Sequence, residues 1–245
     1  MMEPALPNPT NSNASVVLIT GAGSGIGAAT ARLFAAKGWR VALVGRSLAK
    51  LESVRLSLPR AATHVCIEAD LRDAHAARGA VDQAIAKCAG VDTLILAAGI
   101  GVQRPIAAHT ETLIDETLRV NAIAPANMIA QAWEHFISHQ RGCVVLVSSL
   151  ASSDPFTGFL AYAASKAALD SLARSIAIEG RTLGIDAFAL NLGCVETPLL
   201  RRLFSKDTVP AANAMAPEVV AQVCLDCAEG RRAAQSGQCI ILPSP

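Results

Sequence analysis

The sequence predicts an α/β protein in which helices cover both faces of a doubly wound, parallel β-sheet. Short apolar runs rich in Val, Ile and Leu alternate with longer runs of helical periodicity, the pattern of consecutive β-α-β units. Hydrophobic residues make up 52% of the 245 residues and charged residues 17%, so the chain can fill a core on each face of such a sheet. A glycine-rich turn also joins the first apolar run to a helix-forming stretch.

The apolar and helical runs assign the elements in chain order. We expect strands at 16–20, 40–45, 63–68, 92–97, 142–148, 185–191 and 238–242. We expect helices at 25–37, 47–57, 74–89, 110–138, 158–183 and 216–230. Left-handed stops are expected where a glycine falls just past a helix or just before a strand, at Gly38, Gly90, Gly142 and Gly184.

The chain is expected to form one domain. No internal repeat or linker divides residues 15–245. Residues 1–14 are expected to be a flexible tail, because three prolines and several asparagines interrupt any periodicity there. This segment lacks the basic region followed by an apolar core that marks a signal peptide.

The glycine-rich turn has the features of a phosphate-binding site. The apolar run 16–19 leads into Thr20-Gly21-Ala22-Gly23-Ser24-Gly25-Ile26-Gly27, and a helix-forming stretch follows. Glycines allow a tight turn and a close approach of the backbone to a pyrophosphate, which binds the free N–H groups of the helix start. The order strand, turn, helix therefore predicts a dinucleotide site, although a glycine-rich turn alone is more often only a turn.

A second motif contains the only tyrosine of the chain. Tyr162 stands four residues before Lys166, so on a helix both side chains lie on one face. A neighbouring cation favours the phenolate, and we expect Lys166 to lower the pKa of Tyr162 toward neutrality, where the phenol can exchange a proton. The alternative is a half-buried tyrosine beside a surface lysine.

These residues resemble the short-chain dehydrogenases/reductases. That family has T-G-x-x-x-G-x-G at the first turn, Y-x-x-x-K near the middle and a serine thirteen positions before the tyrosine, here Ser149. The resemblance extends from Val16 to the last strand run. It implies a Rossmann-type sheet of seven strands in the order 3-2-1-4-5-6-7.

The resemblance also implies catalytic roles. Tyr162 would be the acid in reduction and the base in oxidation, and Ser149 would hydrogen-bond the substrate oxygen. Lys166 would lower the pKa of Tyr162 and bind the nicotinamide ribose. Asn121 matches a family asparagine that holds a water in a proton relay with the lysine, although a buried structural hydrogen bond would equally explain it.

The end of the second strand run bears on the choice of nicotinamide cofactor. An NAD site usually carries an acid there, whereas this chain has Gly45 and Arg46. An arginine can bind a 2′-phosphate, and Ser47 can add a hydroxyl donor. We therefore expect NADP(H) rather than NAD(H). The alternative is that Arg46 is a solvated residue at a helix start.

Other cofactor contacts are expected by resemblance. Asp70 matches the acid that accepts from the adenine amino group, and a helix cap is its alternative role. The family's N-N-A-G motif reads Leu96-Ala97-Ala98-Gly99 here, which puts stability or positioning in doubt. Its N-P-G-x-V-x-T motif has Leu192 for the proline, which we expect to loosen a turn. The complete expected cofactor set is Gly21, Ser24, Gly25, Ile26, Gly27, Arg46, Ser47, Asp70, Leu71, Ala98, Gly99, Tyr162, Lys166, Gly193, Val195 and Thr197.

Apolar residues are expected around the nicotinamide ring, and they favour an uncharged, rather hydrophobic ketone or secondary alcohol. They are Phe156, Phe159, Leu160, Cys194, Leu199, Leu200, Leu203 and Phe204. Arg201, Arg202 and Lys206 offer an alternative, attraction of an acidic or carrier-bound substrate from the outer side of the loop. A competing function is a non-catalytic NADP(H)-binding redox sensor, but such relatives typically lose the Tyr or the Lys.

The composition of the chain bears on its binding partners and its location. A net charge of +1 gives no basic stripe for nucleic acid and no polybasic membrane patch, and no apolar run is long enough to span a bilayer. Seven scattered cysteines suit buried thiols in a reducing, cytoplasmic setting, and the C-x-x-C at 224–227 has no second pair to complete a metal site. The family usually pairs through the helices flanking the fifth strand, so a homodimer or homotetramer is expected.

Overall fold

The computed structural model describes residues 14–245 and contains a seven-stranded parallel sheet. Its strand order is β3-β2-β1-β4-β5-β6-β7, as the resemblance implied. The strands are β1 (Val16–Thr20), β2 (Arg40–Gly45), β3 (Val65–Glu68), β4 (Thr93–Leu96), β5 (Gly142–Val147), β6 (Ile185–Leu192) and β7 (Cys239–Leu242). The expected tail falls outside the described residues, apart from Ala14.

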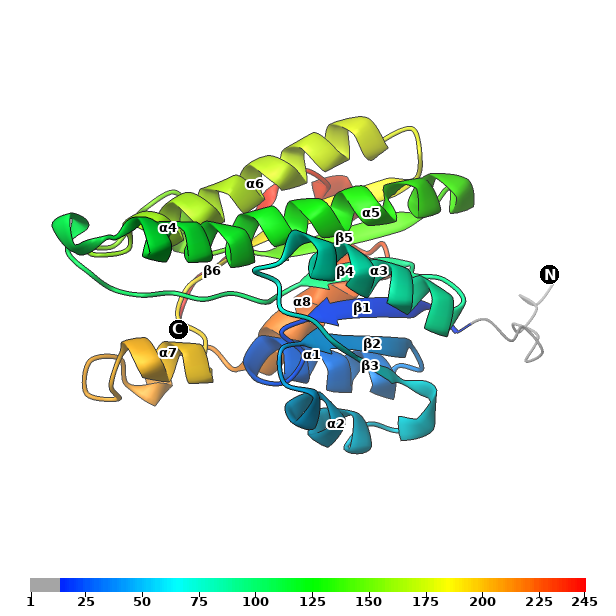
Figure 1. The fold of residues 1–245 in the computed structure, drawn as a ribbon, viewed down its shortest axis with the longest axis horizontal. Coiled ribbons are helices and arrows are strands. Elements are labelled where there is room, and N and C mark those ends of the chain that lie inside the picture. Colours follow the sequence, from blue (N-terminus) through cyan, green and yellow to red (C-terminus); the bar gives the residue numbers. More distant parts are fainter. Residues whose placement is uncertain (1–13) are drawn as a thin grey trace, which may run out of the picture.

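Helices cover both faces of the sheet (Figure 1). One face packs against α1 (Gly25–Ala36), α2 (Leu48–Leu56) and α8 (Pro217–Ala228). The other packs against α3 (Ala74–Cys88), α5 (Ala124–His139) and α6 (Leu160–Gly180), with α4 (Glu111–Leu118) beside α6. The central strands β1, β4 and β5 are buried throughout, which explains their continuous apolar runs.

The expected helix over 110–138 is interrupted. Helix α4 ends at Leu118, a wide π-turn spans Arg119–Ile123, and α5 follows directly. Pro125 supplies the physical reason, because it has no N–H to donate four residues back and its ring would crowd the carbonyl of Asn121. The π-turn accommodates the proline without breaking the line of the two helices.

A short helix absent from the sequence prediction follows β6. Helix α7 (Pro198–Leu203) begins after Thr197, whose side-chain oxygen accepts from the Leu200 N–H at 3.2 Å. Proline at the first helical position and threonine before it are start signals, but six residues are too few to show periodicity. In Figure 1 this helix lies apart from the sheet, beyond the carboxyl ends of the strands.

One predicted glycine stop is wrong. Gly38, Gly90 and Gly184 have positive φ, as expected, but Gly142 does not. The left-handed residue after α5 is Gln140, with φ of 48°. Gly142 is required for another reason, since an added Cβ would lie 2.6 Å from a ring carbon of Phe136.

The sheet accommodates both departures from the family motifs, at Leu96 and at Leu192. Leu96 is buried in β4 and pairs with Thr20 and with Leu146 on its two sides. The Thr20 hydroxyl accepts from the Ala98 N–H at 3.0 Å and so joins the two strand ends. Leu192 extends β6 by pairing with Leu242, so the position of the family's proline belongs to a strand here, and the looser turn stays a prediction.

Candidate active site

The glycine-rich turn forms a cradle that side chains would fill. Gly21 and Gly25 have φ of 68° and 51°, the left-handed region that favours glycine. A Cβ on Gly21 would lie 3.0 Å from the Ala98 Cα, and one on Gly27 would collide with the Gly21 carbonyl. Ser24, the residue before α1, makes no side-chain cap within the described chain, so the N–H groups of the first turn face the cradle unpaired. The turn therefore fits a pyrophosphate.

A cavity of about 220 Å³ continues from this cradle along the carboxyl ends of β1, β2 and β3. Of the expected cofactor residues it brings together Gly21, Ser24, Arg46, Ser47, Asp70, Leu71, Ala98 and Gly99. We call it the dinucleotide cavity. Gly25 and Gly27 shape the turn behind its lining, and Ile26 lines a second cavity described below.

The end of β2 places two candidate phosphate ligands at this cavity. The Ser47 side chain caps α2 by accepting from the Lys50 N–H at 3.5 Å. Arg46 precedes the cap and is exposed, and its guanidinium makes no hydrogen bond or ion pair to another residue in 14–245. Arg46 is therefore available to an anion in the cavity.

Asp70 is held by a neighbouring arginine. Its carboxylate accepts from the Arg72 side chain at 2.6 Å, and this pairing lowers the pKa of Asp70 below its usual range. Asp73, rather than Asp70, caps α3 by accepting from the His75 N–H at 2.7 Å. The helix-cap alternative for Asp70 is thereby wrong, and its position at the cavity remains.

The three family-motif side chains come from two elements. Ser149 follows β5, and its hydroxyl accepts from the Ala151 N–H at 3.2 Å to start a short 3₁₀ turn at Leu150–Ser152. Tyr162 and Lys166 lie one turn apart on α6. Lys166 is buried, its Nζ donates to the Val147 carbonyl at 2.7 Å, and it lies 5.5 Å from the centre of the Tyr162 ring.

The expected effect of Lys166 on Tyr162 is not what the structure shows. Burial raises the pKa of Tyr162 above its ordinary value, and the hydrogen bond with Ser149 opposes this only in part. Burial also lowers the pKa of Lys166 to about 8, with Asp170 acting in the opposite direction. The Lys166 ammonium donates to the Val147 carbonyl rather than to the Tyr162 hydroxyl, and burial remains the main influence on the pKa of Tyr162.

Asn121 makes structural hydrogen bonds. Its side-chain oxygen accepts from the Ile100 N–H at 2.9 Å, and its amide donates to the Ile100 carbonyl at 2.8 Å and to the Ser165 hydroxyl at 3.0 Å. The side chain is fully buried in the π-turn. It thus ties the loop after β4 to α6, which is the structural alternative considered for it.

Beyond Ser149 and Tyr162 lies a mostly apolar cavity of about 380 Å³, which we call the apolar cavity. Phe159 contacts both the Tyr162 ring and Phe204, with ring centres 5.7 and 6.0 Å apart. The expected residues that line it are Phe156, Phe159, Cys194, Leu199, Leu200, Leu203 and Phe204, together with Gly193, Val195 and Thr197 from the loop after β6. Leu160 does not belong to it, because it is 45% exposed on the first turn of α6.

The two cavities meet at Gly99, which lines both. A Cβ on Gly99 would lie 3.5 Å from the Asn121 side-chain oxygen and 3.6 Å from Lys166 Nζ. A molecule that extends from the dinucleotide cavity past Gly99 therefore reaches Lys166, Tyr162 and Ser149. This junction is the centre of the site.

The sequence prediction missed three contributors. Ser148 donates to the Lys166 carbonyl at 3.1 Å, and its place beside Ser149 on the strand end was a usable signal. Ser244 accepts from the Cys194 N–H at 2.7 Å, a contact across fifty residues that no local pattern shows. Arg202, expected on the outer side of its loop, lines the dinucleotide cavity instead.

Metal ligands are not part of this geometry. Within residues 14–245 no group of three or more His, Cys, Asp or Glu side chains could hold a metal ion. Cys224 and Cys227 are buried on α8, and burial raises the pKa of both thiols, that of Cys227 to about 12. The same part of the chain has no helix of the length and apolarity needed to cross a membrane.

The chain belongs to the short chain dehydrogenase family, whose sequence model matches residues 15–208. Among solved structures it is similar to a 3-ketoacyl-(acyl-carrier-protein) reductase from Brucella melitensis complexed with NADH. The two share 27% identity and a TM-score of 0.87 over 93% of this chain and 96% of that one.

Curated relatives bear the names of reductases and dehydrogenases. The chain is 32% identical to a fatty acyl-CoA reductase from Acinetobacter baylyi over 78% of its own length and 65% of the relative's. It is 33% identical to the human dehydrogenase/reductase SDR family member 2, mitochondrial, over 78% and 67%. A glucose 1-dehydrogenase from Gluconobacter oxydans is 32% identical over 75% and 70%. The chain thus matches about two thirds of the length of these relatives.

Proposed function

We propose that this protein is an NADP(H)-dependent oxidoreductase that transfers hydride between nicotinamide and a ketone or secondary alcohol. The junction at Gly99 is the observation that carries the proposal, because it connects the dinucleotide cavity beside the glycine-rich turn to Ser149, Tyr162 and Lys166. The bound nicotinamide would supply the hydride. Gly21, Ser24 and the start of α1 would hold its pyrophosphate, and Gly193, Val195 and Thr197 would flank its ring.

The chain's own residues account for the proton. Ser149 donates a hydrogen bond to the substrate oxygen and stabilises the negative charge that develops there during reduction. Tyr162, kept neutral by burial, gives its proton to the same oxygen. Lys166 of α6 donates to the Val147 carbonyl at the end of β5 and binds the ribose side of the junction. Asn121 positions the loop that lines this side.

The preference for NADP(H) rests on Arg46 and Ser47. Both line the dinucleotide cavity at the end of β2, where an acid would repel a 2′-phosphate. We expect Arg46→Ala to lower kcat/KM for NADPH by roughly tenfold or more and to leave that for NADH nearly unchanged. Equal or better use of NADH by the parent enzyme would contradict the preference.

The substrate is proposed to be an uncharged, bulky apolar carbonyl compound or alcohol. Three phenylalanines and five leucines line the apolar cavity, and no arginine or lysine other than Lys166 does so. A small anionic acid would find no counter-charge there. The acidic or carrier-bound alternative loses support because Arg202 faces the other cavity and Arg201 is paired with Glu196.

The competing function is a redox sensor that binds the dinucleotide without turnover. A panel of aromatic and long-chain ketones, followed by the absorbance of reduced nicotinamide, separates the two. We expect turnover with the native enzyme and a loss of roughly a thousandfold in Tyr162→Phe, because the variant lacks the proton donor. Binding of NADPH by the native protein with no turnover on any ketone would favour the sensor.

Location and assembly are further parts of the proposal. All seven cysteines are free thiols, which supports a reducing compartment such as the cytoplasm. A homodimer or homotetramer is proposed through the α4–α5 and α6 surface, which carries exposed apolar side chains at Ile123 and Ile178.

A further inference from the structure

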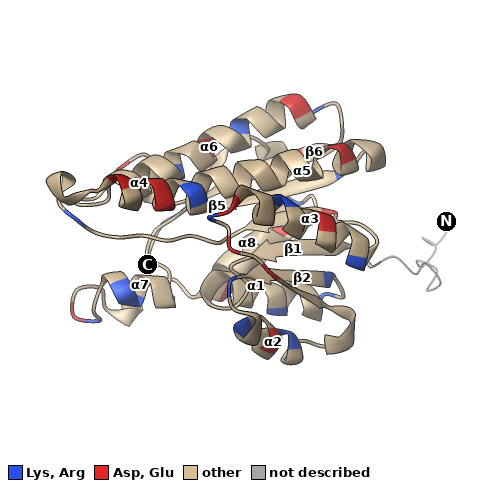
Figure 2. Ribbon diagram, in the orientation of Figure 1, with Lys and Arg blue, Asp and Glu red and all other residues tan. Residues whose placement is uncertain are grey.

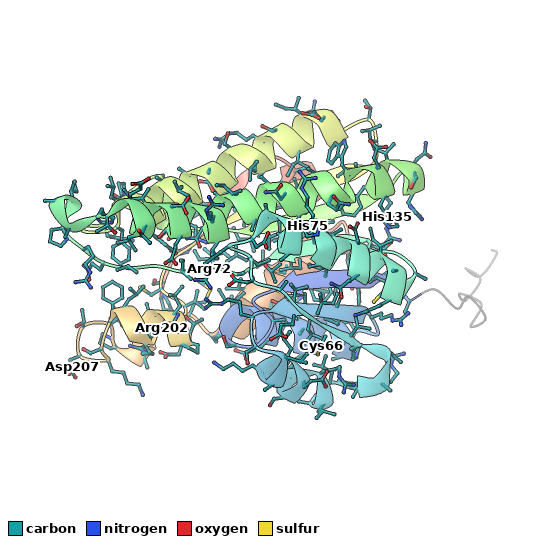
Figure 3. All side chains as sticks on the ribbon, in the orientation of Figure 1. Cys66, Arg72, His75, His135, Arg202 and Asp207 are labelled. Carbon is teal, nitrogen blue, oxygen red and sulfur yellow. The ribbon has the colours of Figure 1, made fainter. Side chains whose placement is uncertain are left out.

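One short helix contributes to both cavities. Leu199, Leu200 and Leu203 of α7 line the apolar cavity, whereas Arg202 of the same helix lines the dinucleotide cavity. Figure 2 shows the basic segment on α7, and Figure 3 shows Arg202 projecting from it. The position of α7 therefore affects both sites at once.

Arg202 has no partner of its own within residues 14–245. Its exposed guanidinium forms no hydrogen bond or ion pair there. Its neighbour Arg201 differs, since it pairs with Glu196 and donates to the Val209 carbonyl at 2.7 Å, contacts that hold the loop together. Two adjacent arginines are thus used differently, one inside the loop and one at the cavity.

The charges at the dinucleotide cavity favour an anion. Arg46, Lys50 and Arg202 line it, and the only acid in the lining is Asp70, which Arg72 already neutralises. Arg72 lies on the segment after β3 (Figure 3). The unpaired N–H groups at the start of α1 add to this positive field.

The start of α7 also touches the phosphate cradle. A Cβ on Gly25 would lie 3.1 Å from the Thr197 methyl carbon and 3.7 Å from Pro198, so helix and glycine turn are in contact. Arg202 follows one turn further along α7. Arg202 lines the same cavity as Gly21, Gly23 and Ser24 of the cradle.

We infer that Arg202 binds a phosphate group of the dinucleotide and thereby holds α7 over the apolar cavity. The inference rests on the proposed function. It adds a phosphate-binding residue that lies outside the glycine-rich turn and the end of β2. Because α7 carries three leucines of the apolar cavity, a dinucleotide held by Arg202 completes the wall against which the substrate packs.

The test measures the Kd for NADPH and for NADH by quenching of protein fluorescence, at several salt concentrations. We expect Arg202→Ala to weaken binding about tenfold, as for loss of one hydrogen bond to a charged group, and to flatten the salt dependence. Arg202→Lys should recover part of the loss because it keeps the charge. Lys206→Ala is the matched control, since it removes a cation of the same segment that lines neither cavity.

The pattern across the two dinucleotides identifies the phosphate. An equal loss for NADPH and NADH assigns Arg202 to the pyrophosphate, and a loss confined to NADPH assigns it to the 2′-phosphate. Native affinity for both in Arg202→Ala would overturn the inference alone. Failure of the native protein to bind either dinucleotide would overturn the proposed function as well.

Limited trypsin digestion tests the effect on α7. NADPH should slow cleavage after Lys206 in the native protein, and saturating NADPH should protect Arg202→Ala less. Equal protection in the two proteins would show that Arg202 does not hold the helix. Thermal unfolding of each variant checks that the fold is intact.

Discussion

At the scale of single residues, burial dominates the chemistry of Tyr162 and Lys166. It raises the pKa of the phenol and lowers that of the ammonium to about 8, because neither charged form is well solvated at the end of β5. A neutral phenol is the form that can donate a proton to a developing alkoxide. The geometry thus suits reduction at neutral pH.

The buried ammonium carries a cost in stability. The folded pKa of Lys166 lies below its ordinary value of 10.5, so the cost is fully present below pH 8 and disappears as the pH rises toward 10.5. We expect Lys166→Met to raise the free energy of unfolding at pH 7 by roughly 2 kcal/mol while abolishing turnover. Denaturant unfolding at pH 7 and pH 10 measures this, and a gain that is the same at both values would contradict it.

The pH dependence of activity should follow the titration of Lys166. If reduction requires the Lys166 ammonium to bind the ribose side of the junction, kcat/KM should be constant at low pH and fall as the pH rises through about 8. The measurement is a pH profile of ketone reduction with subsaturating substrate. A profile that rises through this range would show that an unprotonated group is required instead.

At the scale of elements, Asn121 connects three segments of the site. It lies in the π-turn before α5, bonds both backbone groups of Ile100 after β4, and reaches Ser165 on α6. The π-turn that Pro125 imposes sets the side chain at this position. A uniform helix over 110–138 would have placed the asparagine differently.

Removing this connection should destabilise the protein. Asn121→Ala leaves the partly buried Ile100 N–H and carbonyl without these partners and removes the buried bond to Ser165, and we expect a loss of about 2 kcal/mol. Asn127→Ala is the control and should cost less, because the two hydrogen bonds that it removes, with the Ile123 carbonyl and with Arg78, are exposed to solvent. Equal losses in the two variants, measured by denaturant unfolding, would contradict the structural role of Asn121.

At the scale of the whole molecule, the strands were predictable and the cavities only in part. Buried parallel strands are continuous apolar runs, so their places could be predicted within a few residues, and the motifs located Ser149, Tyr162 and Lys166. The six residues of α7 show no periodicity, and the positions of Arg202 and Ser244 depend on contacts between distant segments. Such contacts leave no local signal.

The surface of α4–α5 and α6 bears on assembly. These helices lie side by side in Figure 1, and Ile178 on α6 is 75% exposed. We expect the native protein to be a dimer or tetramer by light scattering and Ile178→Asp to weaken it, because an exposed apolar side chain of this size suits an interface. Leu56→Asp, at a site on α2 that is 67% exposed, should leave the mass unchanged. A monomeric native protein would contradict the proposal.

The most direct test measures the transfer of deuterium from the nicotinamide to the carbonyl carbon of the substrate at the junction near Gly99. A ketone that the native protein reduces is incubated with NADPH carrying deuterium at the nicotinamide carbon that gives the hydride, and the alcohol is examined by mass spectrometry. We expect deuterium on the carbinol carbon with the native protein and no product with Tyr162→Phe, although the variant binds NADPH with nearly native affinity. Labelled alcohol formed by Tyr162→Phe at the native rate would contradict the central role of the phenol.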